Sequence, residues 1–208
     1  MELTDIFRIL RQRGWLILVL MALTAAAAFG FSRIQTPVYQ SNLKLLVLPS
    51  RTDFGQAQAA KTLLSSYEQW LRSTYRAQAV INDLQLDMTA GDLLGDVRVA
   101  SDANAFVIDL TVENTDPNLA NDIARSWGNQ LIQWQNANND KLQKEDRITI
   151  EFLDDPQAGL DRPDTKINTA AGAVFGLLLG VALLFLLEWL ASGVMRRTLQ
   201  FQPPALTV

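Results

Sequence analysis

Two uncharged, apolar stretches near opposite ends of the chain limit its possible folds more than any other feature. The first runs from Gly14 to Ser32 and the second from Ile167 to Leu187. At about 1.5 Å per helical residue they would span roughly 28 and 32 Å, close to the ~30 Å hydrocarbon thickness of a bilayer. They predict transmembrane helices over residues 14–33 and 167–190, with both termini on one side of the membrane.

The two predicted spans divide the chain into five parts. A cytoplasmic amphipathic segment (1–13) precedes the first span (14–33). An exported domain (34–166) follows and ends in a proline-bearing linker at 154–165. The second span (167–190) leads to a cytoplasmic tail (191–208). The exported side is a periplasm or the cell exterior, according to the envelope. We therefore expect a two-pass protein of the bacterial cytoplasmic (inner) membrane.

Basic residues near the outer ends of the spans favour cytoplasmic termini, because Lys and Arg close to a span tend to stay in the cytoplasm. The residues that set this bias are Arg8, Arg11, Arg13, Arg196 and Arg197. A cleaved signal peptide is the alternative for the first span, since the run Ala25–Ala28 offers small residues for a peptidase. The length of the apolar stretch favours a retained helix.

Composition excludes several kinds of site. The sequence has no Cys and no His, and its 22 acidic residues outnumber its 18 Lys and Arg. Disulfides, thiolate metal sites and a Ser-His-Asp triad are therefore impossible. The predicted exported domain is acidic, so we expect no binding of nucleic acid. We expect no enzymatic activity, cofactor or metal site.

The predicted exported domain combines strands and helices. Val38–Pro49 is rich in apolar residues and partly alternating, and Phe106–Glu113 alternates with period two, so both predict strands. Asp96–Ala100 predicts a third strand that pairs with the second across a polar turn. Gln56–Leu84 carries an apolar stripe at helical spacing and predicts one helix.

The clearest helix start in the chain is Asp116-Pro117. An Asp side chain accepts hydrogen bonds from the unpaired backbone amides at the start of a helix. Pro at the first helical position loses no hydrogen bond, because the amide there has no partner within the helix. An apolar stripe follows as far as about Asn139, and Arg147–Leu153 predicts a last strand. The expected fold is an α+β exported domain, a small mixed sheet packed with long amphipathic helices, between two transmembrane helices.

The segment Asp154–Thr165 contains two prolines, Pro156 and Pro163, among acidic residues. Each proline fixes its own φ and restricts the residue before it, which predicts a semi-rigid, extended connection to the second span. Such a linker either couples the domain mechanically to the membrane or is simply solvated. Both interpretations stay open on the sequence.

The second span carries glycines at Gly172, Gly176 and Gly180. A spacing of four places them on nearly one face of a helix, where another backbone can approach closely. The partner is the first span, the same span of a neighbouring subunit, or a separate polymerase. Glu188 closes this span near the cytoplasmic face, either as an interfacial acid or paired with a basic residue such as Arg13.

Four segments in order resemble the polysaccharide co-polymerase family, the Wzz-type chain-length determinants. They are the amphipathic entry Leu3–Trp15, the Pro-x-Tyr lead Thr36–Ser41, the helix opening Asp116–Ala124 and the closing strand and Gly-rich span Ile150–Glu188. The tail has no Gly-rich phosphate loop and no tyrosine cluster, so the resemblance is to the short form without a fused tyrosine kinase.

This resemblance implies a non-enzymatic membrane protein that forms a homo-oligomer of several subunits, as a bell or ring. It would regulate the chain length, polymerisation or export of a surface polysaccharide such as O-antigen, capsule or exopolysaccharide. A polysaccharide polymerase is the expected partner. Two alternatives stay open: a membrane adaptor of a separate tyrosine kinase, and a scaffold with no polysaccharide link.

Overall fold

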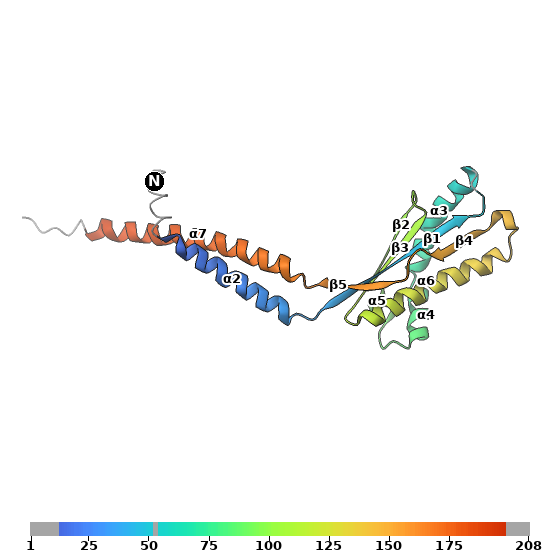
Figure 1. Ribbon diagram of the computed structural model, residues 1–208, viewed down its shortest axis with the longest axis horizontal. Helices are drawn as coiled ribbons and strands as arrows, with labels where there is room; N and C mark the ends of the chain where they lie inside the picture. The colour runs from blue at the N-terminus through green and yellow to red at the C-terminus, as the bar shows by residue number, and fades with distance from the viewer. Residues whose placement is uncertain (1–12, 52–53, 199–208) are drawn as a thin grey trace, which may run out of the picture. The chain divides into compact units, whose positions relative to one another are not determined.

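Two long helices and one sheet carry most of the regular structure in the computed structural model, which describes residues 13–51 and 54–198 (Figure 1). The chain divides into two units. Residues 36–162 form the sheet unit, and the segments that flank them in the sequence form the helix-pair unit. The predicted α+β class is confirmed.

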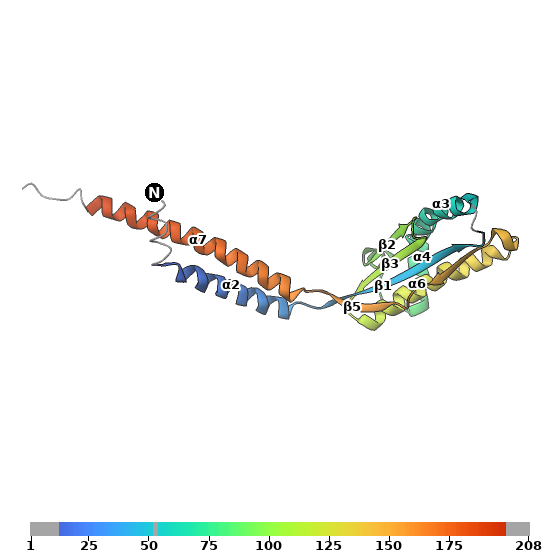
Figure 2. The same ribbon diagram turned by 45° about the horizontal axis from the view of Figure 1, so that its top comes forward.

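The helix-pair unit contains α2 (Trp15–Ile34) and α7 (Thr165–Thr198). Both helices are long and apolar enough to cross a membrane, judged by length and composition. They lie side by side in both views (Figures 1 and 2). α7 starts before and ends beyond the predicted span 167–190, whereas α2 agrees with 14–33 to within one residue at each end.

Several predictions for this unit fall outside the described residues. The amphipathic segment with Arg8 and Arg11 lies there, and so do residues 199–208 of the predicted tail. Arg196 and Arg197 belong to α7 by their backbone, but their side chains are likewise outside the described part. Of the five basic residues that set the predicted orientation, the described structure therefore includes the side chain of Arg13 alone.

The sheet unit is built on a five-stranded sheet. β1 is the central strand of the sheet. It pairs with β3 on one side, and with β4 and β5 at different parts of its other side. In chain order the strands are β1 (Val38–Pro49), β2 (Val97–Asp102), β3 (Val107–Asn114), β4 (Ile148–Phe152) and β5 (Gln157–Arg162).

The prediction of a mixed sheet is wrong, because all the strand pairs are antiparallel. After β1 the chain makes a helical excursion and returns with β2, which runs in the same direction as β1. The two do not pair, since β3 lies between them and runs antiparallel to both. The short polar turn from β2 to β3 makes this possible, because antiparallel neighbours need only a tight connection.

Helices α3 (Phe54–Leu71), α4 (Thr74–Leu84) and α6 (Pro117–Asn139) pack with the sheet around one hydrophobic core. Alternate residues of β1 face that core: Leu43, Leu45 and Val47 are buried, whereas Asn42 and Lys44 between them are exposed. This is the pattern of an antiparallel sheet with one packed and one solvated face.

The single helix predicted over 56–84 is divided into α3 and α4. Ser73 interrupts it, because its backbone is extended, with φ −76° and ψ 142°. The Ser73 hydroxyl donates to the carbonyl oxygen of Trp70 at 2.8 Å, so it satisfies a free acceptor at the end of α3. A short helix that the sequence analysis missed, α5 (Ala90–Gly95), follows and begins with a capping box between Thr89 and Asp92.

α6 begins at Pro117 as predicted. The Asp116 carboxylate accepts from the amides of Asn118 and Leu119 at 2.8 and 3.4 Å. The Trp127 side chain lies in the core without exposure, and its indole Nε1 donates to the carbonyl oxygen of Leu71 at 3.1 Å. This bond anchors α6 to the end of α3.

Half of the segment 154–165, which the sequence predicts to be a linker, is a strand of the sheet. Residues Gln157–Arg162 form β5, which pairs with Val38–Asn42 at the start of β1. The backbone of β1 there needs hydrogen-bond partners, and β5 supplies them. Pro156 and Pro163 lie just outside the two ends of β5. Proline has no backbone N–H, and at these positions the sheet loses no hydrogen bond between strands.

Candidate functional site

The three glycines of α7 lie against α2 of the same chain. A Cβ atom added at Gly172 would lie 2.6 Å from Cβ of Ala28 and 2.9 Å from the carbonyl oxygen of Thr24. Real Cβ atoms do not approach other atoms this closely, so a larger residue would push the helices apart. In the structure, the helix that packs against this glycine face is α2, the first predicted span of the same chain.

Gly176 and Gly180 are buried, and both meet backbone atoms of α2. An added Cβ at Gly176 would lie 2.7 Å from Cα of Met21 and would also overlap the Thr24 hydroxyl. At Gly180 it would lie 2.9 Å from Cα of Ile17. Because a backbone cannot rotate away as a long side chain can, these two positions fix the spacing of the pair. Close backbone packing of this kind is how helices associate in lipid.

A small polar cluster joins the helices near the C-terminus of α2. Ser32 is 1% exposed, and its hydroxyl donates to Oγ1 of Thr165 at 3.3 Å. The Asn168 amide donates to the Ser32 hydroxyl at 3.1 Å. Hydrogen bonds between apolar helices fix their register, because unpaired polar groups are costly away from water. In the sequence this cluster is visible only as polar residues at the ends of the two apolar stretches.

Arg13 and Glu188 meet at the far end of the helix pair. A guanidinium nitrogen of Arg13 lies 3.9 Å from a carboxylate oxygen of Glu188, and both side chains are partly exposed. The structure thus brings together the two residues that were considered as a pair. At this distance and exposure in water the pair would contribute little to stability.

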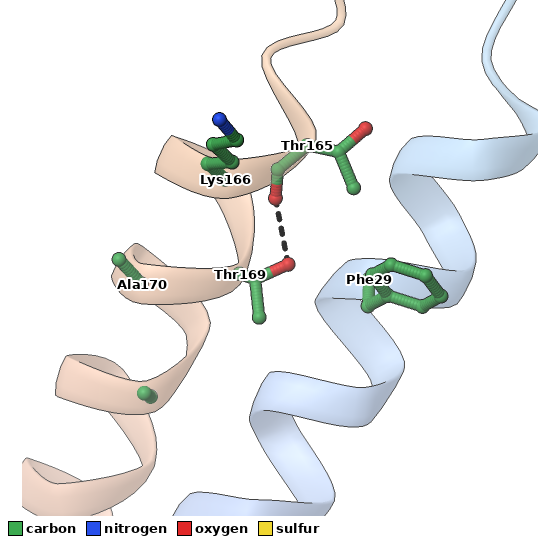
Figure 3. A pocket seen from close by; sticks show the side chains of 6 residues that line it. Phe29, Thr165, Lys166, Thr169 and Ala170 are labelled. Atoms are coloured by element: carbon green, nitrogen blue, oxygen red, sulfur yellow. Dashed lines mark hydrogen bonds between the residues drawn. The ribbon is translucent and has the colours of Figure 1, made fainter.

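An open hollow of about 430 Å³ lies beside the polar cluster, between Phe29 of α2 and the first turns of α7 (Figure 3). Its surface is mostly apolar, and among the described residues that line it Lys166 alone is ionisable. The Thr169 hydroxyl donates to the Thr165 carbonyl oxygen at 2.6 Å. These side chains can accommodate an apolar chain, but they form no pair of acid and base for catalysis.

In the sheet unit, a charged cluster joins side chains from β2, β3 and β5. Glu113 on β3 forms ion pairs with Arg98 of β2, at 3.0 Å, and with Arg162 of β5. Asp96, at the C-terminus of α5, lies near this group, and its pKa is raised by burial first and then by the charges of Glu113 and Asp92. The ion pair between Arg162 and Glu113 links β5 to β3 across the intervening strand β1.

A chain of buried hydrogen bonds links α3, α6 and β4. The Tyr67 hydroxyl donates to Oε1 of Gln135 at 2.9 Å, and the Gln135 amide donates to Oδ1 of Asn139 at 3.0 Å. Asn139 in turn donates to the Ile148 carbonyl oxygen and accepts from the Ile148 amide. Burial raises the pKa of Tyr67 to about 12. This chain holds the end of α6 against β4.

Comparisons with known proteins find similarity to proteins named for polysaccharide biosynthesis. A family model described as Wzz, chain length determinant protein, matches residues 1–84. The chain is 26% identical over 206 residues to a Bacillus subtilis protein named "Probable capsular polysaccharide biosynthesis protein YwqC", covering 93% of this chain and 81% of that one.

Two streptococcal proteins match over a similar length. Capsular polysaccharide biosynthesis protein CpsC of Streptococcus pneumoniae is 24% identical over 207 residues, covering 94% of this chain and 86% of the relative. The protein of the same name from Streptococcus agalactiae is 26% identical over 199 residues, covering 91% and 85%. Residues 1–84 are therefore similar to the chain length determinant model, and the chain as a whole is consistent with the polysaccharide co-polymerase family.

Proposed function

We propose that this protein takes part in the biosynthesis of a bacterial surface polysaccharide and regulates the length to which the polymer grows. The observation that carries the proposal is the similarity of nearly the whole chain to proteins named for capsular polysaccharide biosynthesis. The match of residues 1–84 to the chain length determinant model supports the regulatory role.

The helix pair supports an anchor in the cytoplasmic membrane. Both helices are long and apolar enough to span a bilayer, and small residues line their contact. With Arg13 at the outer end of α2, the positive-inside rule favours cytoplasmic termini. The sheet unit is then the exported part.

The role in this proposal is organisational rather than catalytic. Several copies of the chain assemble in the membrane beside a polysaccharide polymerase, and the geometry of the assembly sets how long the polymerase holds a growing chain. Homo-oligomerisation and the polymerase as partner belong to the proposal and follow from the family resemblance.

Deletion of the gene in its own strain, followed by complementation, tests the function. We expect deletion to change the length distribution of the surface polysaccharide on a gel, and the wild-type gene to restore it. Complementation with Gly176→Leu should fail, because the substitution separates the helices, while Gly30→Leu should succeed, since an added Cβ at Gly30 meets nothing within 4 Å. An unchanged length distribution after deletion would contradict the proposal.

Native mass spectrometry of the protein in nanodiscs tests the assembly. We expect a discrete oligomer of several subunits. A monomer or dimer under mild conditions would contradict a ring and favour an adaptor for a separate tyrosine kinase, which loss of phosphotyrosine in the deletion strain would then reveal.

A further inference from the structure

A polar groove runs between α4 and α6 in the sheet unit, on helices labelled in Figure 1. Its volume is about 420 Å³, within the range of sites for small ligands. We call it the α4/α6 groove, and its lining residues are Arg76, Ala79, Asp83, Ser126, Asn129, Gln130 and Gln133. Their spacing of three and four places them on one face of each helix.

Three amide side chains from α6 dominate the lining. Asn129 and Gln133 are exposed, and neither is engaged in a described side-chain hydrogen bond. Gln130 is half-buried, and its Oε1 atom is buried without a hydrogen-bond donor among the residues that the structure describes. A buried acceptor of this kind costs free energy unless something donates to it. An amide offers a donor and an acceptor side by side, which suits neighbouring hydroxyl groups.

The two ends of the groove are held in place by contacts within the protein. At one end the guanidinium carbon of Arg76 lies 3.9 Å from the centre of the Trp70 ring. At the other end the Ser126 hydroxyl donates to the Asp83 carboxylate at 2.6 Å. Both contacts restrict the motion of Arg76 and Asp83. Each of these groups has further hydrogen-bonding atoms, so a ligand could bind to them with little additional loss of side-chain entropy.

An exposed aromatic ring stands next to the Arg76 end. Tyr75 is 74% exposed, and its ring centre lies 5.0 Å from the guanidinium carbon of Arg76. A ring in this position offers an apolar face and a polar hydroxyl together. The combination suits a molecule with flat C–H surfaces and many hydroxyl groups.

The lining distinguishes a saccharide from a protein partner. Cores of protein interfaces are depleted of charged groups and rich in apolar anchors, whereas Ala79 is the one apolar side chain among the groove residues. We propose that the α4/α6 groove binds a short saccharide segment of the polymer, with the amides, Arg76 and Asp83 contacting its hydroxyl groups. The identity of that polymer rests on the proposed function; the class of ligand rests on the groove.

The test is a binding measurement on the full chain in nanodiscs by isothermal titration calorimetry. The probe is a set of oligosaccharides obtained by partial acid hydrolysis of the surface polysaccharide of the strain that carries the gene. Dextran oligosaccharides of equal length show whether binding is selective for that polymer or extends to any hydroxyl-rich chain.

The test variant is the double substitution Asn129→Ala and Gln133→Ala, and the matched control is Asn136→Ala. All three side chains are exposed on α6, but Asn136 does not line the groove. We expect the double variant to bind about tenfold more weakly, the effect of losing one or two hydrogen bonds. The control should bind as the wild type does, and circular dichroism should show all three proteins folded.

Absence of binding to the wild type, or equal binding by the double variant, would overturn the inference. A double variant with altered oligomeric mass and unaltered affinity would identify the groove as a contact between copies and would also overturn it. The deletion experiment separates this result from the proposed function, because deletion can change polymer length whether or not the groove binds sugar.

Discussion

The two units of this chain are built in opposite ways. In the sheet unit large apolar side chains such as Trp127 and Leu43 form a buried core, and charged residues such as Lys44 face outward. In the helix-pair unit the glycines Gly176 and Gly180 are buried, while many large apolar residues are exposed. Exposed examples are Leu18, Phe31, Phe175 and Leu178.

This difference fits the proposed membrane anchor, in which the helix pair lies in lipid and the sheet unit in water. A domain in water gains stability by burying apolar area, so its large apolar residues lie inside. Helices in lipid gain nothing from that burial and associate by close packing of small residues instead. Substitutions that remove the feature on which each mode of packing depends should therefore separate the two modes.

The largest effect is expected in the core of the sheet unit. Trp127→Ala removes a fully buried indole and its bond to Leu71, and should lower the free energy of unfolding by about 3–5 kcal/mol. Chemical denaturation followed by circular dichroism measures the change. Tyr75→Ala removes an exposed aromatic ring and should change the value by less than about 0.5 kcal/mol. Equal effects would contradict the assigned core.

The helix pair should respond to added volume rather than to lost volume. Gly176→Leu places side-chain atoms against the backbone at Met21 and should cost about 1–3 kcal/mol or more of helix association. The chain has no natural cysteine, so cysteines introduced at Ser32 and Asn168 report the contact by cross-linking in membranes. Their yield should fall with Gly176→Leu and stay unchanged with Gly30→Leu. An unchanged yield in both would contradict glycine packing.

The buried hydrogen-bond chain of the sheet unit should have an intermediate effect. Asn139→Ala leaves the amide and the carbonyl of Ile148 without their partner, at a cost of about 1–3 kcal/mol. Thermal unfolding of the variant measures this loss. Asn136→Ala, an exposed asparagine on the same helix, serves as the control and should unfold with the wild type. A control variant that loses as much stability would contradict the assigned role of the Ile148 hydrogen bonds.

The smallest effect is expected at Asp96, and it depends on pH. Its pKa is raised in the folded protein, so the folded state binds more protons than the unfolded state and loses stability as pH rises through this range. Asp96→Asn removes the penalty and should raise the melting temperature slightly at pH 7. Below the ordinary pKa of an aspartate, near pH 3, the two proteins should melt together. A variant less stable than the wild type at pH 7 would contradict the assigned cause.

The sequence predicted the elements whose signals are local. The two apolar helices, the start of α6 at Asp116-Pro117 and the alternation of Ile108, Leu110 and Val112 in β3 follow directly from composition and period. The capping box of α5 was also visible as Thr89 and Asp92, three residues apart, and could have been found.

The features that were missed depend on tertiary contacts. β5 has no alternating pattern, and it is a strand because β1 presents a free edge there. Phe106 belongs to the predicted strand, but its φ of 55° takes it into the turn before β3, where its carbonyl accepts from the amide of Val47. The amides of the α4/α6 groove look like a solvated helix face until α4 is placed beside them.

In the proposed topology the helix pair crosses the membrane and the sheet unit lies outside the cytoplasm. Because the chain has no cysteine, the single variants Tyr75→Cys and Arg13→Cys can be labelled in spheroplasts with a membrane-impermeant maleimide. The account predicts that the cysteine at position 75 is labelled in intact spheroplasts and the cysteine at position 13 only after lysis. Labelling of position 13 before lysis, or protection of position 75 until lysis, would contradict it.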